Sequence, residues 1–254
     1  MKAKNILKTN KNIICIFIIV SIFFCNYLIN KVYATEISEK SDNLAKEKIL
    51  EINKNNTNII EENIQKQRNN KVIIVGDSRM EYIEKEADIV DIPINFSFIA
   101  LGGSKIDWFE ENATQALTEK LNNADNKYNY HVIFNMGVND MQNREDMNAL
   151  ADDYYKLYRN FAHKYQNINF YILSVNPVNE EKIYEKYKYR GRTDKKVNNY
   201  NETIKNMIYN DKLENIYYCD SYNSIEFISP DGLHYEETTD QKIINFIVND
   251  CINK

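Results

Sequence analysis

The stretch Lys71-Val-Ile-Ile-Val-Gly-Asp-Ser-Arg79 decides the fold of this chain. Residues 72–75 form a short apolar run of β-branched side chains, which is typical of a strand buried on both faces in a parallel sheet. Gly76 and Asp77 break this run, and residues 79–85 have the pattern of a helix start. We therefore expect Ser78 at a strand-to-helix turn, where unpaired backbone N–H groups favour negative charge. The same residues also fit a plain helix cap without any chemistry.

Further apolar runs and helical patterns alternate along the rest of the chain. The runs that predict strands cover residues 94–100, 131–135, 168–173 and 215–219. The patterns that predict helices cover residues 105–122, 147–165, 197–208 and 240–249. This alternation predicts five parallel strands joined by right-handed crossovers, with helices on both faces of the sheet. In such a sheet, ligands bind beyond the carboxyl ends of the strands.

The N-terminal part of the chain predicts export. Residues 1–12 carry four lysines and no acid, and an apolar run follows over residues 13–29. We expect residues 1–34 to be a signal peptide cleaved after Ala34 or a retained membrane anchor, and the pattern leaves both open. Residues 35–70 are polar and predict a linker. The predicted catalytic domain, residues 71–254, then works outside the cytoplasm, either secreted or attached to the outer face of the membrane.

Composition and cysteine content limit the function further. The chain has 254 residues, of which 43% are hydrophobic and 27% charged, as in a globular protein. A net charge of −5 does not favour a nucleic-acid partner. The export context permits a disulfide between Cys219 and Cys251, but two cysteines carry no spacing signature that would decide it.

Each informative motif falls where a predicted strand stops. These motifs are Ala100-Leu-Gly-Gly-Ser104, Met136-Gly-Val-Asn-Asp140 and Ser229-Pro-Asp-Gly-Leu-His-Tyr235. At one edge of a parallel sheet they would converge on Ser78. Ser78 would then attack an acyl carbon, His234 would take its proton, and Asp231 would fix the imidazole tautomer.

The same motifs supply donors for an oxyanion. The backbone N–H groups of Ser78 and Gly103 and the side-chain amide of Asn139 are the predicted oxyanion hole. Asn139 and Asp140 also fit an ordinary turn pair, in which neither side chain has a catalytic role.

Taken together, these motifs resemble the SGNH hydrolases, also called the GDSL esterase/lipase family. The family's blocks are similar to Gly76-Asp77-Ser78, to Gly102-Gly103, to Gly137-Val-Asn-Asp140 and to Asp231-Gly-Leu-His234, in this order. The resemblance implies a flavodoxin-like three-layer α/β/α sandwich and ester hydrolysis without a metal or other cofactor. Arg79 departs from the leucine of the family's usual motif and puts the substrate preference in doubt.

Three features suggest how a substrate binds. Arg79 could read a substrate anion, since a cation in the first turn of a helix is unfavourable by itself. Trp108 could stack on a sugar ring, or pack into the core from an amphipathic helix. Residues 179–196 form a polar insertion with several Tyr and Arg residues after the fourth predicted strand, and they could line the substrate or form a solvated loop.

The sequence therefore predicts a serine esterase that acts on O-acyl groups, most plausibly acetyl groups, of cell-wall or other glycans or on another small ester. The same triad would serve an O-acyltransferase. A non-catalytic glycan-binding module on this fold is less compatible with the complete set of motifs. A metallophosphoesterase would need several His and acidic ligands, and the chain has three His, two of them outside any motif.

Overall fold

The structure is a computed structural model that describes residues 67–89 and 92–253, together with residues 52, 54, 56, 57, 59, 61 and 65. The predicted export segment, residues 1–34, and most of the predicted linker lie outside these residues. Within the described part of the chain, no helix has both the length and the apolar character needed to cross a membrane. The unit that carries the sheet comprises residues 64–254.

Five parallel strands form a single sheet in this unit, in the order β2-β1-β3-β4-β5. Their bounds are Asn70–Gly76 for β1, Asn95–Ala100 for β2, Asn129–Asn135 for β3, Asn169–Leu173 for β4 and Ile216–Cys219 for β5. The order is that of flavodoxin-like folds, in which the chain reverses its direction of growth beside β1. The predicted fold class is therefore confirmed.

The helices connect the strands. They are α3 (Ser78–Glu86), α4 (Ile106–Trp108), α5 (Thr114–Asn122), α6 (Met147–Lys164), α7 (Glu180–Tyr187), α8 (Asp194–Asn210), α9 (Ser221–Ser224) and α10 (Glu237–Phe246). The predicted helix over residues 105–122 is interrupted, because a π-helical turn, η1 (Phe109–Ala113), separates α4 from α5. A second π-helical turn, η3 (Ile247–Ile252), extends α10, and a 3-10 turn, η2 (Asp140–Gln142), follows β3.

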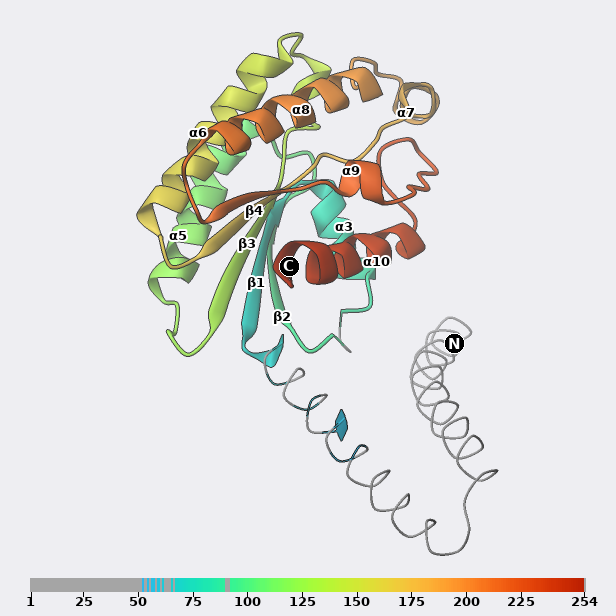
Figure 1. Cartoon of the computed structure of the whole chain (residues 1–254). Coiled ribbons are helices and arrows are strands. Elements are labelled where there is room, and N and C mark those ends of the chain that lie inside the picture. Colours follow the sequence, from blue (N-terminus) through green and yellow to red (C-terminus); the bar gives the residue numbers. More distant parts are fainter. Residues whose placement is uncertain are drawn as a thin grey trace, which may run out of the picture. The chain divides into compact units, whose positions relative to one another are not determined.

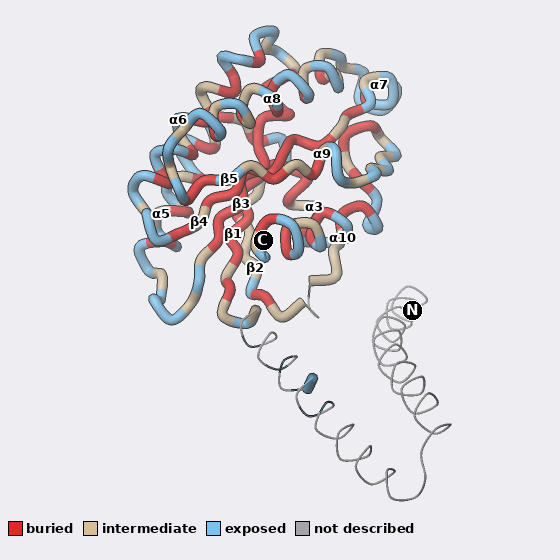
Figure 2. Tube along the Cα trace, viewed as in Figure 1, coloured by how far each residue is buried: buried red, intermediate tan, exposed pale blue. Residues whose placement is uncertain are grey.

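Helices cover both faces of the sheet, with α5, α6 and α8 on one side and α3 and α10 on the other (Figure 1). The β1 side chains alternate between the two cores: Ile73 and Val75 face the first, whereas Val72 and Ile74 face the second. Figure 2 shows buried residues gathered along the strands in the middle of this unit, and β1, β3 and β4 are buried over most of their length. Burial on both faces explains why β1 is an unbroken apolar run rather than an alternating one.

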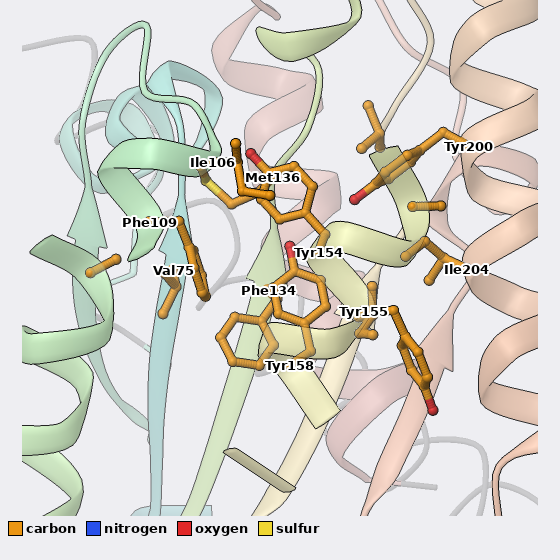
Figure 3. Packing of buried hydrophobic residues seen from close by; sticks show 14 of the residues in the cluster. Val75, Ile106, Phe109, Phe134, Met136, Tyr154, Tyr155, Tyr158, Tyr200 and Ile204 are labelled. Atoms are coloured by element: carbon orange, nitrogen blue, oxygen red, sulfur yellow. The ribbon is translucent and has the colours of Figure 1, made fainter. Parts of the chain in front are cut away.

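Aromatic side chains fill the core below the carboxyl ends of the strands (Figure 3). The rings of Phe134 and Tyr158 stack with centroids 4.3 Å apart, and Phe109 meets both at an edge. These contacts join β3, α6 and η1 into one rigid block. On the opposite face, a disulfide joins Cys219 at the end of β5 to Cys251 in η3, with Cα atoms 5.8 Å apart. The pairing that the sequence left open is thus present.

Asp240 of α10 is an ionisable group buried in this fold, with only 1% of its surface exposed. Burial raises its pKa to about 7, and the carboxylates of Glu86 and Glu237 add to the shift. In the unfolded chain the ordinary value is about 3.9. Between about pH 4 and 7 the folded chain therefore holds a proton that the unfolded chain releases, so stability falls as the pH rises through this window.

We expect Asp240→Asn to remove this pH dependence. The variant should be more stable than the wild type at pH 8, by roughly 1–4 kcal/mol, and should gain little or nothing at pH 4.5. Urea unfolding at the two pH values measures the effect. Asp152→Asn, a change at the surface of α6, is the control and should give equal shifts at both. An Asp240→Asn variant whose gain is the same at pH 4.5 and pH 8 would contradict the assignment.

Candidate active site

Ser78 is the first residue of α3 and lies directly beyond the carboxyl end of β1. Asp77 caps the helix, because its side chain accepts a hydrogen bond from the N–H of Arg79 at 3.0 Å. The cap role therefore belongs to Asp77, and the Ser78 hydroxyl is left available. Gly76 is required here because a Cβ atom would collide with the side chain of Met80. Close packing of the first helical turn on the strand, rather than an unusual backbone angle, explains this glycine.

The other two residues of the predicted triad meet Ser78 at this edge. His234 Nε2 lies 2.9 Å from Ser78 Oγ, and His234 Nδ1 lies 2.8 Å from Asp231 Oδ2. The second carboxylate oxygen of Asp231 accepts the backbone N–H groups of Leu233 and His234 at 2.8 and 2.7 Å. Asp231 thus holds its own loop in shape and fixes the imidazole ring. Serine, imidazole and carboxylate form one continuous hydrogen-bonded chain.

Tyr187, at the end of α7, adds a further hydrogen bond to this chain. Its hydroxyl donates to Asp231 Oδ2 at 2.6 Å and lies 3.3 Å from His234 Nδ1. Burial alone would raise the pKa of Asp231, but the hydrogen bonds from Tyr187, His234 and two backbone amides outweigh it and lower the pKa to about 2. Asp231 is therefore a carboxylate at any pH at which an esterase works.

The predicted oxyanion donors lie beside the serine. Gly103, with φ of +74°, follows β2 in a conformation that side chains rarely adopt, and it lines the same cleft as Ser78. The amide of Asn139 is buried, donates to the carbonyl oxygen of Ser104 at 3.0 Å and accepts a hydrogen bond from Arg192. Although Asn139 precedes η2, its side chain does not cap that turn. Residues 137–140 do form a turn, closed by the hydrogen bond from the Asp140 N–H to the carbonyl oxygen of Gly137 at 3.1 Å, but the Asn139 side chain has its own partners in Ser104 and Arg192.

Asp140, the next residue, points away from the cleft. Its carboxylate accepts the N–H of Ile106 at 3.3 Å and the hydroxyl of Tyr154 at 2.8 Å. These bonds tie the loop after β3 to the start of α4 and to α6. Burial raises the pKa of Asp140, and the bonds from Tyr154 and Ile106 oppose that shift. Asp140 therefore holds two loops in register, while its neighbour Asn139 faces the site.

A cleft of about 420 Å³ opens in front of Ser78. Its lining is mostly polar and aromatic, and it combines Ser78, His234 and the predicted oxyanion residues with Glu81, Tyr82, Lys85, Tyr187, Tyr189 and Arg192. The ring of Tyr82 lies 4.7 Å from the imidazole of His234. The polar insertion between β4 and α8 therefore lines the site, as the sequence allowed. The sequence did not lead us to predict that Glu81, Tyr82 and Lys85 of α3 line the cleft. Their helical spacing from Ser78 could have indicated that they share its face of the helix.

The structure corrects the predicted substrate role of Arg79. Its side chain is 1% exposed, and its guanidinium donates to the carbonyl oxygens of Leu233 and Asn176 at 3.1 and 3.0 Å. The guanidinium also lies over the ring of Tyr235, 5.2 Å from its centroid. Burial raises the pKa of Asp77, and the charge of Arg79 acts against that shift. Arg79 therefore joins α3 to the loop before His234 and is absent from the cleft lining.

The surroundings of Trp108 bear on the two alternatives that the sequence left open for it. It packs against the larger hydrophobic core at the end of α4 and is absent from the cleft lining. The alternative interpretation, core packing from an amphipathic helix, describes it correctly.

Because Arg79 satisfies two buried carbonyl groups, we expect Arg79→Met to destabilise the fold by roughly 2–5 kcal/mol. Its effect on KM should be the same for acidic and neutral esters. Thermal unfolding and steady-state kinetics with a matched pair of esters measure both. Arg144→Met, which removes a surface ion pair with Asp153, is the control and should change stability by less than about 1 kcal/mol. A rise in KM restricted to acidic esters, without loss of stability, would restore the substrate role.

Comparisons with known proteins agree with this fold. The chain is similar in fold to a Streptococcus pneumonia protein provisionally described as a platelet activating factor, with 16% identity over 79% of this chain and 97% of that one and a TM-score of 0.58. It also resembles the acetyl xylan esterase AlAXEase, with 17% identity over 72% of this chain and 100% of that one and a TM-score of 0.51.

A third similar structure is a carbohydrate acetylesterase from Sinorhizobium meliloti, with 12% identity over 71% of this chain and 99% of that one and a TM-score of 0.50. At such low identities these structures establish the fold alone. No curated protein sequence matches the chain significantly. The model of the GDSL-like Lipase/Acylhydrolase family, however, matches residues 74–247, which is more than half of the chain. The chain therefore belongs to the GDSL-like lipase/acylhydrolase family and is a serine hydrolase that acts on ester bonds.

Proposed function

We propose that this hydrolase is an exported esterase that removes O-acyl groups, above all acetyl groups, from glycans through a triad of Ser78, His234 and Asp231. The observation that carries the proposal is the hydrogen-bonded chain from Ser78 Oγ through the imidazole to the Asp231 carboxylate. The Ser78 hydroxyl faces one imidazole nitrogen of His234, and the Asp231 carboxylate faces the other. The carboxylate stays ionised because its pKa is about 2.

In the first half of the reaction, Ser78 Oγ attacks the carbonyl carbon of the ester while His234 Nε2 takes the hydroxyl proton. The imidazolium that forms is stabilised by Asp231. The carbonyl oxygen becomes an oxyanion and accepts hydrogen bonds from the N–H groups of Ser78 and Gly103 and from the Asn139 amide. When the intermediate collapses, the C–O bond to the sugar breaks, and His234 returns the proton to the departing sugar hydroxyl.

In the second half, water takes the place of the sugar hydroxyl. His234 removes a proton from the water while the water oxygen attacks the acyl carbon of the ester on Ser78. The same donors stabilise the second oxyanion, and collapse releases the carboxylic acid and restores the serine. If a sugar hydroxyl attacked in place of water, the same steps would produce acyl transfer.

The lining of the cleft supports a polar substrate. Tyr82 and Tyr187 are 39% and 37% exposed at its walls, and Lys85 and Glu81 lie at its edge. Aromatic walls with nearby polar groups suit a sugar ring, which presents apolar C–H faces and hydroxyl groups. Two proteins of similar fold, the acetyl xylan esterase and the carbohydrate acetylesterase, have names that indicate substrates of this class. The basic and apolar N-terminal pattern supports export.

We expect a serine-directed fluorophosphonate to label Ser78, since its hydroxyl is paired with the imidazole of His234 and faces the cleft. Peptide mass spectrometry should find the added mass on the peptide that contains Ser78, and Ser78→Ala should lose both label and activity. Ser174, a buried serine bonded to Ser221, is the internal control and should stay unlabelled. Turnover without labelling of Ser78 would exclude the proposed nucleophile.

The substrate class is tested by incubating the purified enzyme with acetylated glycans and following acetate. Free acetate that increases with time, and that depends on Ser78, is the expected result. Acetate that appears on an added sugar acceptor instead would identify a transferase. Turnover of long-chain lipid esters alone would contradict the glycan substrate.

Asn139→Ala should separate catalysis from stability. An oxyanion donor acts mainly in the transition state, so we expect kcat to fall by about 10²–10³-fold while KM changes little. Asp140→Ala should show the opposite pattern, with a loss of roughly 1–3 kcal/mol of stability and a smaller effect on kcat of the folded enzyme, because Asp140 joins loops. Steady-state kinetics and thermal unfolding of both variants measure this contrast. If Asn139→Ala kept more than about a third of the wild-type kcat, its oxyanion role would be wrong.

A further inference from the structure

The side chain of Asn139 is held at both of its polar atoms. Its Nδ2 donates to the carbonyl oxygen of Ser104 at 3.0 Å, and its Oδ1 accepts from a guanidinium nitrogen of Arg192 at 2.9 Å. An amide nitrogen carries two hydrogens, so one N–H remains after the bond to Ser104. Asn139 lines the cleft together with Ser78 and Gly103, which places this second N–H among the predicted oxyanion donors.

We propose that Arg192 is the positioning residue that fixes the Asn139 amide for the oxyanion. The proposal rests on the function proposed above, since it needs Asn139 as a donor. The sequence singled out Arg192 only as one of several polar residues in the insertion, 53 residues away from Asn139.

The two partners leave the amide one favourable orientation. A half-turn about the last side-chain bond would place the NH₂ group against the guanidinium, which has donors only, and the amide oxygen against the carbonyl oxygen of Ser104. Both contacts would then be repulsive. With Arg192 removed, the Ser104 bond alone would hold the amide, and a larger share of molecules would present it wrongly. The positive charge beside Oδ1 also polarises the amide and strengthens its N–H as a donor.

Arg192 itself is held firmly in place. It is 6% exposed, its guanidinium lies over the ring of Tyr189 with 4.6 Å to the centroid, and it donates to the Tyr189 hydroxyl. The preceding residue, Gly191, has φ of +100°, and a Cβ atom there would collide with the carbonyl oxygen of Gln142 in η2. The insertion is therefore packed directly against the turn that follows Asn139. A rigid donor on a packed segment suits a positioning role better than mobile capture of a ligand.

The test compares Arg192→Met and Arg192→Lys with the wild type in the full-length enzyme, on one neutral acetyl ester. We expect Arg192→Met to lower kcat by about 10–100-fold with KM within about threefold, because the affected interaction is made in the transition state. Arg192→Lys keeps a cation and a donor and should recover part of kcat. Arg190→Met is the matched control: Arg190 lies on the same segment but contacts Glu181 and the Tyr184 ring, and its loss should leave kcat unchanged.

A double-mutant cycle with Asn139→Ala identifies the route of the effect. If Arg192 acts through Asn139, Arg192→Met should lower kcat of the Asn139→Ala enzyme by less than about threefold. A loss of the same size in both backgrounds would mean that Arg192 acts on the substrate directly, and would overturn the proposal. A rise in KM with kcat unchanged would overturn it in the same way. If Arg192→Met does not fold, the cycle is run with Arg192→Lys and judged by the same criteria.

The Asn139→Ala enzyme also separates the two levels of inference. If Asn139→Ala lowers kcat and Arg192→Met does not, the positioning role is wrong and the oxyanion assignment stands. If Asn139→Ala has no effect on kcat, the oxyanion assignment fails and the positioning role fails with it.

Discussion

A buried guanidinium joins the two halves of this active site. Arg79 follows the proposed nucleophile Ser78 along the chain, and Leu233, whose carbonyl oxygen Arg79 binds, precedes His234. The same guanidinium also binds the carbonyl oxygen of Asn176 beyond β4. One side chain thus ties the first turn of α3 to the loops after two other strands. The 2.9 Å contact between Ser78 Oγ and His234 Nε2 lies next to this attachment, and the ring contact between Tyr82 and His234 supports it from the other side.

The sheet could be predicted closely because its signals are local. An unbroken β-branched run such as residues 72–75 fits only a strand covered on both faces, and each of the five runs ends within a residue or two of a strand end. Helix interruptions were not predictable in this way. The π-helical turn at Phe109–Ala113 leaves the apolar spacing of the segment nearly unchanged, so the pattern reads as one continuous helix.

The site shows the same division. Ser78, Gly103 and Asn139 stand just beyond strand ends, and the geometry of a parallel sheet brings strand ends together whatever the details of packing. Asp231 and His234 lie in the loop between α9 and α10, and they were predicted from their motif. The role of Arg79 could not be read in the same way. A cation in a first helical turn suggests a surface ligand, and its true partners are backbone carbonyls 97 and 154 residues away. Every residue has a backbone carbonyl group, so a backbone acceptor cannot be recognised from residue types. The bonds from Tyr187 to Asp231 and from Arg192 to Asn139 are hidden for a similar reason, since an insertion can fold toward or away from the edge.

The order of the strands has a consequence for when this enzyme becomes active. The proposed nucleophile and its proposed base are 156 residues apart, and the base lies after the last strand of the sheet. A chain that emerges from its N-terminus therefore presents Ser78 and both predicted oxyanion loops long before it contains His234, the proposed base for Ser78. Hydrolysis has to wait until nearly the whole domain is available and the final loop has closed onto α3. An enzyme exported as proposed would therefore stay inert during synthesis and passage through a membrane, because the last part of the domain to appear completes its chemistry.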